Sequence, residues 1–272
     1  MIPHAVGIPR DPQGVSLGDQ SPGRRLKVLS YNIQTGIATT RYRDYVTHGW
    51  RHLVPHTRRW QNLDLMVESG LRAFDIVGLQ EMDGGSMRTG YVNQARYLAE
   101  RADFPFWYNQ VNRRMGRLAR HSNGLLSRIE PTETFDYKLP GLPGRGALLS
   151  RFGHHPHWIT VIVVHLALSQ RARSRQMLFL SQLVNAHPHA VVMGDFNCDS
   201  NAPEVKLLLD STDLVLPDTE ENTFPTWRPS RRIDHILVTR EIVVEKAYVP
   251  QWAYSDHLPV ALELRIPPDV LP

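Results

Sequence analysis

The chain of 272 residues is 42% hydrophobic and 21% charged, and it carries a formal net charge of +4 at pH 7. This composition excludes a wholly disordered chain, and no apolar run reaches the roughly 18 residues that a membrane-spanning helix requires. The single cysteine, Cys198, excludes an intramolecular disulfide and a multi-cysteine zinc site, so we expect a soluble cytoplasmic protein.

The predicted elements alternate between strands and helices along one domain. Residues 1–25 are rich in Pro and Gly and predict a flexible lead-in, and residues 26–267 predict a single α/β domain. Nearly continuous apolar, β-branched runs predict strands that are covered on both faces, at 26–33, 75–81, 157–166, 190–197, 233–238 and 260–266. Helical patterns are expected at 57–71, 93–101, 169–186 and 202–210, with loops at 139–146 and 225–230. The third helix and its flanking strands predict a βαβ unit.

Polar side chains recur next to these strands. They are Asn32, Glu81, His165, Asp195 and Asn197 at strand ends, Asp234 and His235 at the start of a strand, and Asp256 and His257 just before one. Because ligands of α/β folds bind where strand ends meet, we expect these side chains to converge. Amide and carboxylate oxygens favour Mg²⁺ or Mn²⁺ over zinc, and histidines beside carboxylates can transfer protons near neutral pH.

Each of these residues also has a structural explanation when it is taken alone. Asn32 is a common turn former, His165 fits a buried core histidine, and Asp195 with Asn197 fits an Asx-turn. Asp234 fits a buried acceptor for a backbone group. Since the pattern repeats at six strands, a shared site explains it better than six coincidences.

The ordered motifs SYNI, LQE, VHL, GDFN, RIDHIL and SDH resemble the endonuclease/exonuclease/phosphatase (DNase I-like) superfamily over residues 26–266. The resemblance implies a four-layer α/β sandwich, with two mixed β-sheets packed face to face and helices outside. It also implies an enzyme that hydrolyses phosphoesters with a divalent metal, Mg²⁺ or Mn²⁺.

The resemblance assigns a role to each matching residue. It implies metal binding by Asn32, Glu81 and Asp256, activation of water by Asp195, phosphate or second-metal contact by Asn197, transition-state stabilisation by His257 and orientation of that histidine by Asp234. His165 matches a histidine of DNase I-type nucleases and sphingomyelinases. Abasic-site endonucleases resemble one another in having tyrosine there, which argues against abasic-site repair.

The substrate is less well defined by the sequence. Arginine supplies most of the basic residues, which suits phosphate but equally fits the codon usage of a GC-rich genome. Arg145 and Asn123 are predicted substrate contacts, although Arg145 also fits a structural hairpin. Arg113, Arg114, Arg117 and Arg120 are consistent with a phosphate-binding loop or with a solvated basic face.

Two further segments allow two interpretations each. Arginines and aromatics within 41–60 could stack on bases and contact phosphates, or could form an amphipathic surface helix. His48, His52 and His56 share a helical spacing, but solvated histidines are the simpler interpretation of it. We expect a phosphodiesterase that acts on nucleic acid, and the alternatives are a lipid or sugar phosphate substrate and, less favoured, a phosphate-binding module without turnover.

Overall fold

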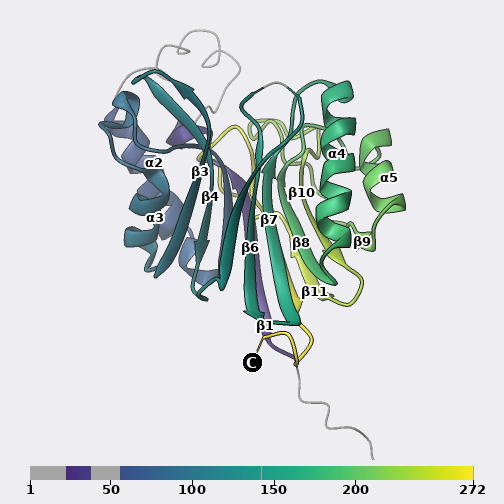
Figure 1. Ribbon diagram of the computed structural model, residues 1–272. Helices are drawn as coiled ribbons and strands as arrows, with labels where there is room; N and C mark the ends of the chain where they lie inside the picture. The colour runs from purple at the N-terminus through teal and green to yellow at the C-terminus, as the bar shows by residue number, and fades with distance from the viewer. Residues whose placement is uncertain (1–22, 38–55, 142, 272) are drawn as a thin grey trace, which may run out of the picture.

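The computed structural model describes residues 23–37, 56–141 and 143–271. Two mixed six-stranded sheets pack face to face between two layers of helices (Figure 1). In the order of neighbouring strands, the first sheet contains β11 (Val243–Tyr248), β12 (Val260–Arg265), β1 (Arg25–Asn32), β2 (Ile76–Asp83), β4 (Ala119–Ser127) and β3 (Phe106–Met115). The second contains β5 (Glu133–Lys138), β6 (Gly146–His154), β7 (His157–His165), β8 (His189–Asp195), β10 (Asp234–Thr239) and β9 (Leu214–Val215).

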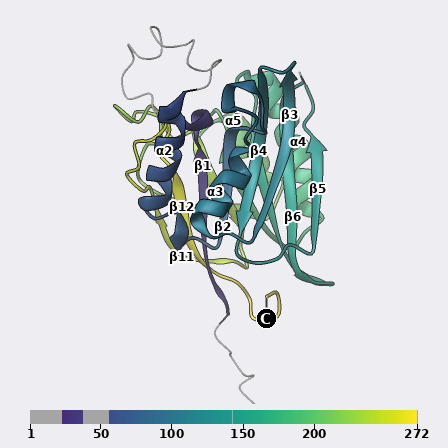
Figure 2. The same ribbon diagram turned by 90° about the vertical axis from the view of Figure 1, so that its left-hand side faces the viewer.

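Four α-helices lie within the described residues: α2 (Thr57–Glu68), α3 (Gln94–Ala102), α4 (Gln170–Asn185) and α5 (Pro203–Asp210). Short 3-10 helices are η1 (Gln34–Gly36), η3 (Leu71–Ala73) and η4 (Met87–Thr89). Helices α2 and α3 cover the first sheet, as Figure 2 shows from that side, and α4 and α5 cover the second. The predicted four-layer sandwich is therefore confirmed.

Three apolar clusters hold these layers together. The central one joins the inner faces of both sheets, for example Val28 and Leu262 with Val163 and Met193. One outer cluster lies between the first sheet and α2 and α3, and the other between the second sheet and α4 and α5. The sheets approach closely, because a Cβ added at Gly78 would lie 2.6 Å from Met193 Sδ. Continuous burial on both faces explains why the central strands are almost uniformly apolar.

Each sheet contains one parallel pair of strands at its centre. In the first sheet β1 is parallel to β2, and in the second β7 is parallel to β8, with α4 as the crossover between them. The predicted βαβ unit is thus confirmed. Parallel strands end at the same edge of a sheet, so each pair brings its carboxyl ends to one end of the sandwich.

All six predicted strands and all four predicted helices are present, but six strands were not predicted. These are β3, β4, β5, β6, β11 and the two-residue strand β9. Strands β3 and β4 carry the buried polar residues Gln110 and Asn123 near the site, and β5 and β11 are partly exposed at sheet edges. Alternation of apolar and polar residues is therefore too weak in them to predict a strand.

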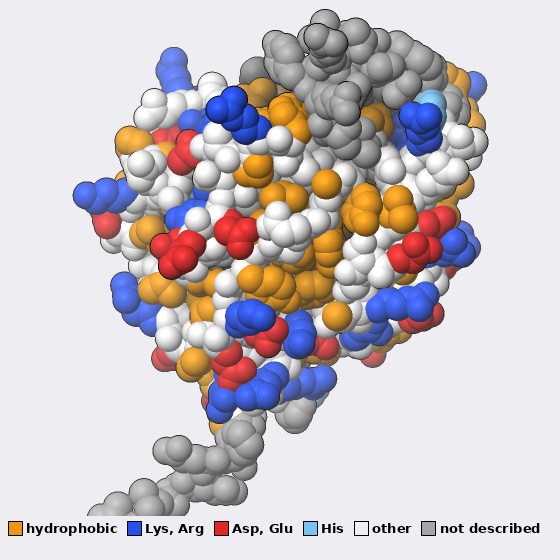
Figure 3. All heavy atoms as spheres, turned by 180° about the vertical axis from the view of Figure 1, so that it is seen from behind, with side chains coloured by type: hydrophobic (Ala, Val, Ile, Leu, Met, Phe, Trp, Pro, Cys, Tyr) orange, Lys and Arg blue, Asp and Glu red, His pale blue; other side chains and the backbone are white. Residues whose placement is uncertain are grey.

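Charged side chains of opposite sign are mixed over the surface seen in Figure 3. Ion pairs at the surface of the described residues include those of Arg25 and Arg265 with Glu245 and that of Arg240 with Asp213. Within the part of the chain that the structure describes, no helix is both long enough and apolar enough to cross a membrane.

Candidate active site

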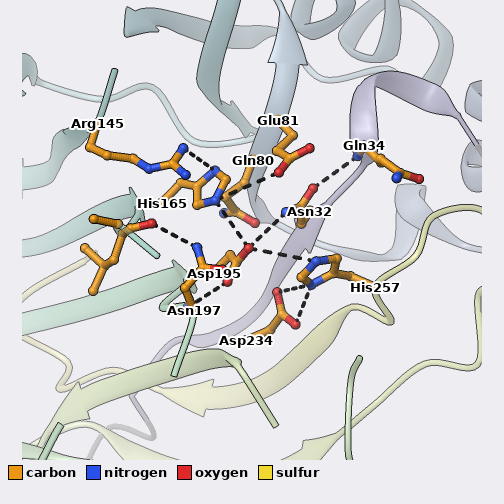
Figure 4. Close-up of polar contacts among 12 residues, drawn as sticks. Asn32, Gln34, Gln80, Glu81, Arg145, His165, Asp195, Asn197, Asp234 and His257 are labelled. Carbon is orange, nitrogen blue, oxygen red and sulfur yellow. Dashed lines mark hydrogen bonds and ion pairs between the residues drawn. The ribbon is translucent and has the colours of Figure 1, made fainter. Parts of the chain in front are cut away.

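The candidate site lies where the carboxyl ends of the two parallel pairs face each other across the sandwich (Figure 4). Asn32 ends β1 in the first sheet, and His165 and Asp195 end β7 and β8 in the second. His165 and Asp195 are paired in the strand register, and Asp195 is also paired with Asp234 of β10. The topology therefore brings together residues that are far apart in the sequence.

Asp195 is the centre of this cluster and is only 2% exposed. Its Oδ2 accepts a hydrogen bond of 3.0 Å from Asn32 Nδ2, and its Oδ1 accepts one of 2.8 Å from the Asn197 backbone N–H. Burial raises the pKa of Asp195 to about 7, although the charge of His257 acts in the opposite direction. A carboxyl group with such a pKa can accept or release a proton near neutral pH.

His257 forms a buried pair with Asp234. Its Nδ1 lies 2.9 Å from Asp234 Oδ2, and Asp234 also accepts a hydrogen bond of 2.6 Å from Thr223 Oγ1. Burial alone would lower the pKa of His257, but the carboxylates of Asp234 and Asp195 raise it to about 10. The imidazole is therefore protonated at neutral pH, and its Nε2 lies 3.9 Å from Asp195 Oδ2.

His165 is in the opposite protonation state. Burial and the charge of Arg145 hold its pKa well below the usual value. Arg145 Nη1 lies 3.3 Å from His165 Nδ1, and His165 Nε2 lies 3.4 Å from Asp195 Oδ2. An arginine can only donate, so Nδ1 accepts and the neutral imidazole carries its proton on Nε2, directed at Asp195.

Glu81 and Asp256 supply the oxygen-rich side of the site. Strand β2 has a bulge between Leu79 and Met82, and Glu81 adopts a positive φ of 53° there, which leaves its side chain 38% exposed. Asp256 is buried and accepts a hydrogen bond of 3.1 Å from Gln34 Nε2. Burial raises the pKa of Asp256 to about 6, and the negative charge of Glu81 adds to this effect.

This arrangement fits a divalent cation. Two carboxylates whose charges repel would both be stabilised by a cation between them, and their oxygens are ligands of the type that Mg²⁺ and Mn²⁺ prefer. The Asn32 side-chain oxygen accepts a hydrogen bond of 3.1 Å from the Gln34 backbone N–H, and an amide oxygen has a second lone pair. The residues present thus suit the hard metal that the sequence predicts.

A second group could also hold a metal. Asp195, Asp234 and His257 present potential ligand atoms that all lie within 4.8 Å of one another. However, His257 Nδ1 already contacts Asp234 Oδ2 at 2.9 Å, so this nitrogen is engaged in a pair with a carboxylate. We therefore interpret these three residues as a group that handles protons and charge.

The two predicted substrate contacts take different positions. Arg145 is partly exposed beside His165, at the rim of the site. Asn123 is buried and donates its side-chain amide to the Gly146 carbonyl at 3.1 Å, so it holds the first residue of β6. Asn197 has a positive φ of 55° and donates its side-chain amide to the Leu166 carbonyl at 2.9 Å.

Other sequence predictions lie away from the centre. Arg113, Arg114, Arg117 and Arg120 belong to the β3–β4 hairpin rather than to a loop. His235 is buried and contacts the Cys198 carbonyl at 2.9 Å. Burial raises the pKa of the Cys198 thiol to about 12, so it is not a reactive thiolate. His48, His52 and most of segment 41–60 lie outside the described residues, whereas His56 caps α2 by accepting from the Arg58 backbone N–H.

Two supporting residues were missed by sequence reasoning. Gln34 holds Asp256, and Thr223 holds Asp234. Gln34 follows the SYNI motif closely, so its distance from Asn32 was a usable signal. Thr223 lies in an irregular segment, and nothing in the sequence around it indicates the contact.

A family model described as "Endonuclease/Exonuclease/phosphatase family" matches residues 29–257. No curated protein sequence matches the chain significantly. Among solved structures, a Beutenbergia cavernae endonuclease/exonuclease/phosphatase is 21% identical, with a TM-score of 0.67 over 89% of this chain and 72% of that one.

Two other similar structures have more specific names. A mannosyl-6-phosphatase of Bacteroides thetaiotaomicron is 18% identical, with a TM-score of 0.67 over 88% of this chain and 99% of that one. D. rerio TDP2 complexed with a single-strand DNA product is 16% identical, with a TM-score of 0.63 over 89% and 99% of the two chains. At these identities the similarity shows the shared fold.

Proposed function

The chain belongs to the endonuclease/exonuclease/phosphatase family, and from this premise we propose that it is a divalent-metal-dependent phosphodiesterase. The observation that carries the proposal is the contact between Asp195 and two histidines in opposite protonation states. A site that only binds phosphate has no need for a carboxyl group of raised pKa between a proton donor and a neutral imidazole.

The proposed reaction is in-line attack of water on the phosphorus atom. Asp195 orients the water and takes its proton, since burial gives this carboxyl a pKa of about 7. Asn32 Nδ2 and the Asn197 backbone N–H hold the Asp195 carboxylate in place. The bond between phosphorus and the leaving oxygen breaks as the new P–O bond forms, and the leaving oxygen departs as an alkoxide that takes a proton from solvent.

His257 stabilises the charge that develops on the phosphate oxygens. Asp234 fixes the ring through Nδ1, which leaves the Nε2 proton free to contact a phosphate oxygen. Phe224 packs against the His257 ring, with centroids 4.8 Å apart, and restricts its rotation. Arg145 lies beside His165 and contributes a second positive charge at the rim.

Glu81, Asp256 and the side-chain oxygen of Asn32 would hold Mg²⁺ or Mn²⁺. When bound, the metal supplies a positive charge that polarises the P–O bond and offsets the charge of the phosphate. Gln34 keeps Asp256 oriented through its hydrogen bond of 3.1 Å. Since the charge of Glu81 disfavours the ionised form of Asp256, a cation held by both carboxylates would stabilise them, which supports metal dependence.

The test is hydrolysis of bis(p-nitrophenyl) phosphate by the purified protein in EDTA, Mg²⁺ or Mn²⁺. We expect turnover only with metal, and its loss in an Asp195→Asn/His257→Ala double variant. A folded protein that shows no turnover with either metal would contradict the proposal. Turnover that persists in the double variant would contradict the assigned residues.

We favour nucleic acid as the substrate. Arg113 of the β3–β4 hairpin lies against the loop that carries Arg145 at the rim of the site, and similarity to TDP2 complexed with single-strand DNA supports the same direction. A lipid phosphodiester is the second candidate, because five large apolar side chains are exposed on η4, on the segment directly after it and on the β3–β4 hairpin: Met87, Tyr91, Val92, Met115 and Leu118. Sedimentation with anionic phospholipid vesicles would support the lipid, and competition by single-stranded oligonucleotide would support nucleic acid.

A further inference from the structure

The β3–β4 hairpin forms one wall of the site and places a second arginine next to Arg145. Arg113 on β3 is paired in register with His121 on β4, and His121 is paired with Asp83 of β2, two residues beyond Glu81. The stem of Arg113 packs on Gly144, because a Cβ added there would lie 3.3 Å from Arg113 Cδ. Arg113 therefore lies against the loop that carries Arg145.

The two guanidinium groups repel each other. Burial lowers the pKa of Arg145; the charge of Arg113 adds to this, whereas Glu81 and Asp195 oppose it. Among residues 23–37, 56–141 and 143–271, no carboxylate lies within 4.0 Å of Arg113 or Arg145, although many other arginines are paired with acids. Such a like-charged pair is stabilised when an anion lies between its members.

The protein keeps these charges together with hydrogen bonds between the sheets. Asn123 donates to the Gly146 carbonyl at 3.1 Å, and Gln110 donates to the Ala147 carbonyl at 3.0 Å. Asn123 also donates to Gln110 Oε1 at 3.3 Å. These buried amides tie the loop of Arg145 to the hairpin of Arg113, so the repulsion does not separate them.

His121 lies on β4 between its register partners Arg113 on β3 and Asp83 on β2. It is half-buried, and its charge would act on His165, which places it on the inner side of the hairpin. Burial and the charge of Arg88 lower the pKa of His121, so a neutral ring can donate one hydrogen bond without adding to the repulsion.

We infer that Arg113, His121 and Arg145 form an anion subsite that binds the phosphate next to the scissile one. Arg145 contacts His165 at the centre, and Arg113 lies farther out on the β3–β4 hairpin. A nucleic acid strand that left the site on this side would pass both arginines. The inference rests on the proposed function and narrows its substrate to a nucleic acid strand, which carries successive phosphates. A lone phosphodiester would leave Arg113 without an anion.

The test measures binding by calorimetry in EDTA, where the metal-dependent reaction does not proceed. The ligands are the thymidine dinucleotides TpT, pTpT and TpTp, which differ only in a terminal phosphate. We expect one phosphorylated form to bind about 10-fold tighter than TpT, as a bidentate arginine–phosphate contact supplies. We expect Arg113→Gln to reduce this preference to less than about threefold.

Arg117→Gln is the matched control, because it removes the same charge from the tip of the same hairpin. It should keep the 10-fold preference, and Arg113→Lys should keep part of it, since lysine retains the charge but not the planar fork. Equal binding of all three dinucleotides by the unaltered protein would overturn the inference. If Arg113→Gln and Arg117→Gln lost the preference for the terminal phosphate equally, the inference would also be overturned. Such a result would show only a general electrostatic attraction of the hairpin for phosphate.

Failure of the proposed function has a separate readout. If metal-dependent hydrolysis of bis(p-nitrophenyl) phosphate is absent, the phosphodiesterase proposal fails whatever the dinucleotides do. If hydrolysis is present but the terminal phosphate has no effect on binding, the subsite alone is wrong.

Discussion

The two sheets have the same plan but contribute differently to the site. From β11 to β3 and from β5 to β9, the strands follow the same sequence of directions, with one parallel pair at the centre of each sheet. The second sheet supplies His165, Asp195 and Asp234, which are all buried and joined to partners by hydrogen bonds or ion pairs. The first sheet supplies Glu81, which extends from a bulge and is 38% exposed.

This difference separates the part of the site that is formed by side chains alone from the part that needs a bound cation. The proton-handling group of the second sheet is formed by side chains alone, because each charge there has a charged or polar partner. At the other side of the site, the negative charge of Glu81 adds to burial in raising the pKa of Asp256, and a cation would stabilise both carboxylates. The same strand topology thus supports a second-sheet group whose charges are paired with one another and a first-sheet end that presents the exposed carboxylate of Glu81.

The largest expected effect comes from removing Asp195, the proposed general base at the end of β8. Asp195→Asn should lower kcat by about 10⁴-fold, because an amide cannot take a proton from water. Steady-state assays with bis(p-nitrophenyl) phosphate would measure it, with Asp213→Asn, an exposed acid, as the control. A loss below tenfold would show that Asp195 is not the base.

A smaller effect is expected from the buried ion pair between Asp83 at the end of β2 and Arg88 of η4. Arg88 Nε lies 2.5 Å from Asp83 Oδ2, and both side chains are almost fully buried. Arg88→Met should lower the free energy of unfolding by about 3–5 kcal/mol, since Asp83 would stay buried without its cation. Urea unfolding measures this, and adding Asp83→Asn should restore part of the loss. A change under 1 kcal/mol would contradict this reading.

The ion pair between Arg173 of α4 and Glu204 of α5 should contribute less to the free energy of unfolding. Arg173 Nε lies 2.6 Å from Glu204 Oε1, but Arg173 keeps 11% of its side chain exposed. Arg173→Met should cost about 2 kcal/mol by urea unfolding, because solvent still reaches the site. Arg175→Met, on the exposed side of the same helix, should change stability by less than about 0.5 kcal/mol. Equal effects of both changes would show that the ion pair contributes nothing specific.

The smallest effect concerns how the stability of the fold changes at acid pH, through His187 in the connection between α4 and β8. Burial and the charge of Arg151 lower the pKa of His187. As pH falls below the ordinary histidine pKa near 6.5, the unfolded chain therefore gains a proton that the folded chain does not, and stability decreases. His187→Gln should flatten the change in the unfolding midpoint between pH 7 and 5. An unchanged slope would rule out this contribution.

The same contrast explains how far the sequence could be interpreted. The central strands and the residues at their ends were predictable, because strands buried on both faces are continuously apolar and end in polar motifs such as GDFN and SDH. The β3–β4 hairpin was not predicted, since Gln110 and Asn123 face inward and remove the alternation that marks a strand. Contacts such as Thr223 with Asp234 depend on tertiary packing, which no local pattern encodes.

The central claim is that Glu81 takes part in metal binding and Asp234 does not. It is tested most directly by calorimetric titration of Mn²⁺ into the unaltered protein, Glu81→Gln and Asp234→Asn. We predict that Glu81→Gln weakens Mn²⁺ binding at least about 10-fold, whereas Asp234→Asn changes it by less than about threefold. The reverse result, with binding lost in Asp234→Asn and kept in Glu81→Gln, would place the metal between Asp195, Asp234 and His257 and contradict the account.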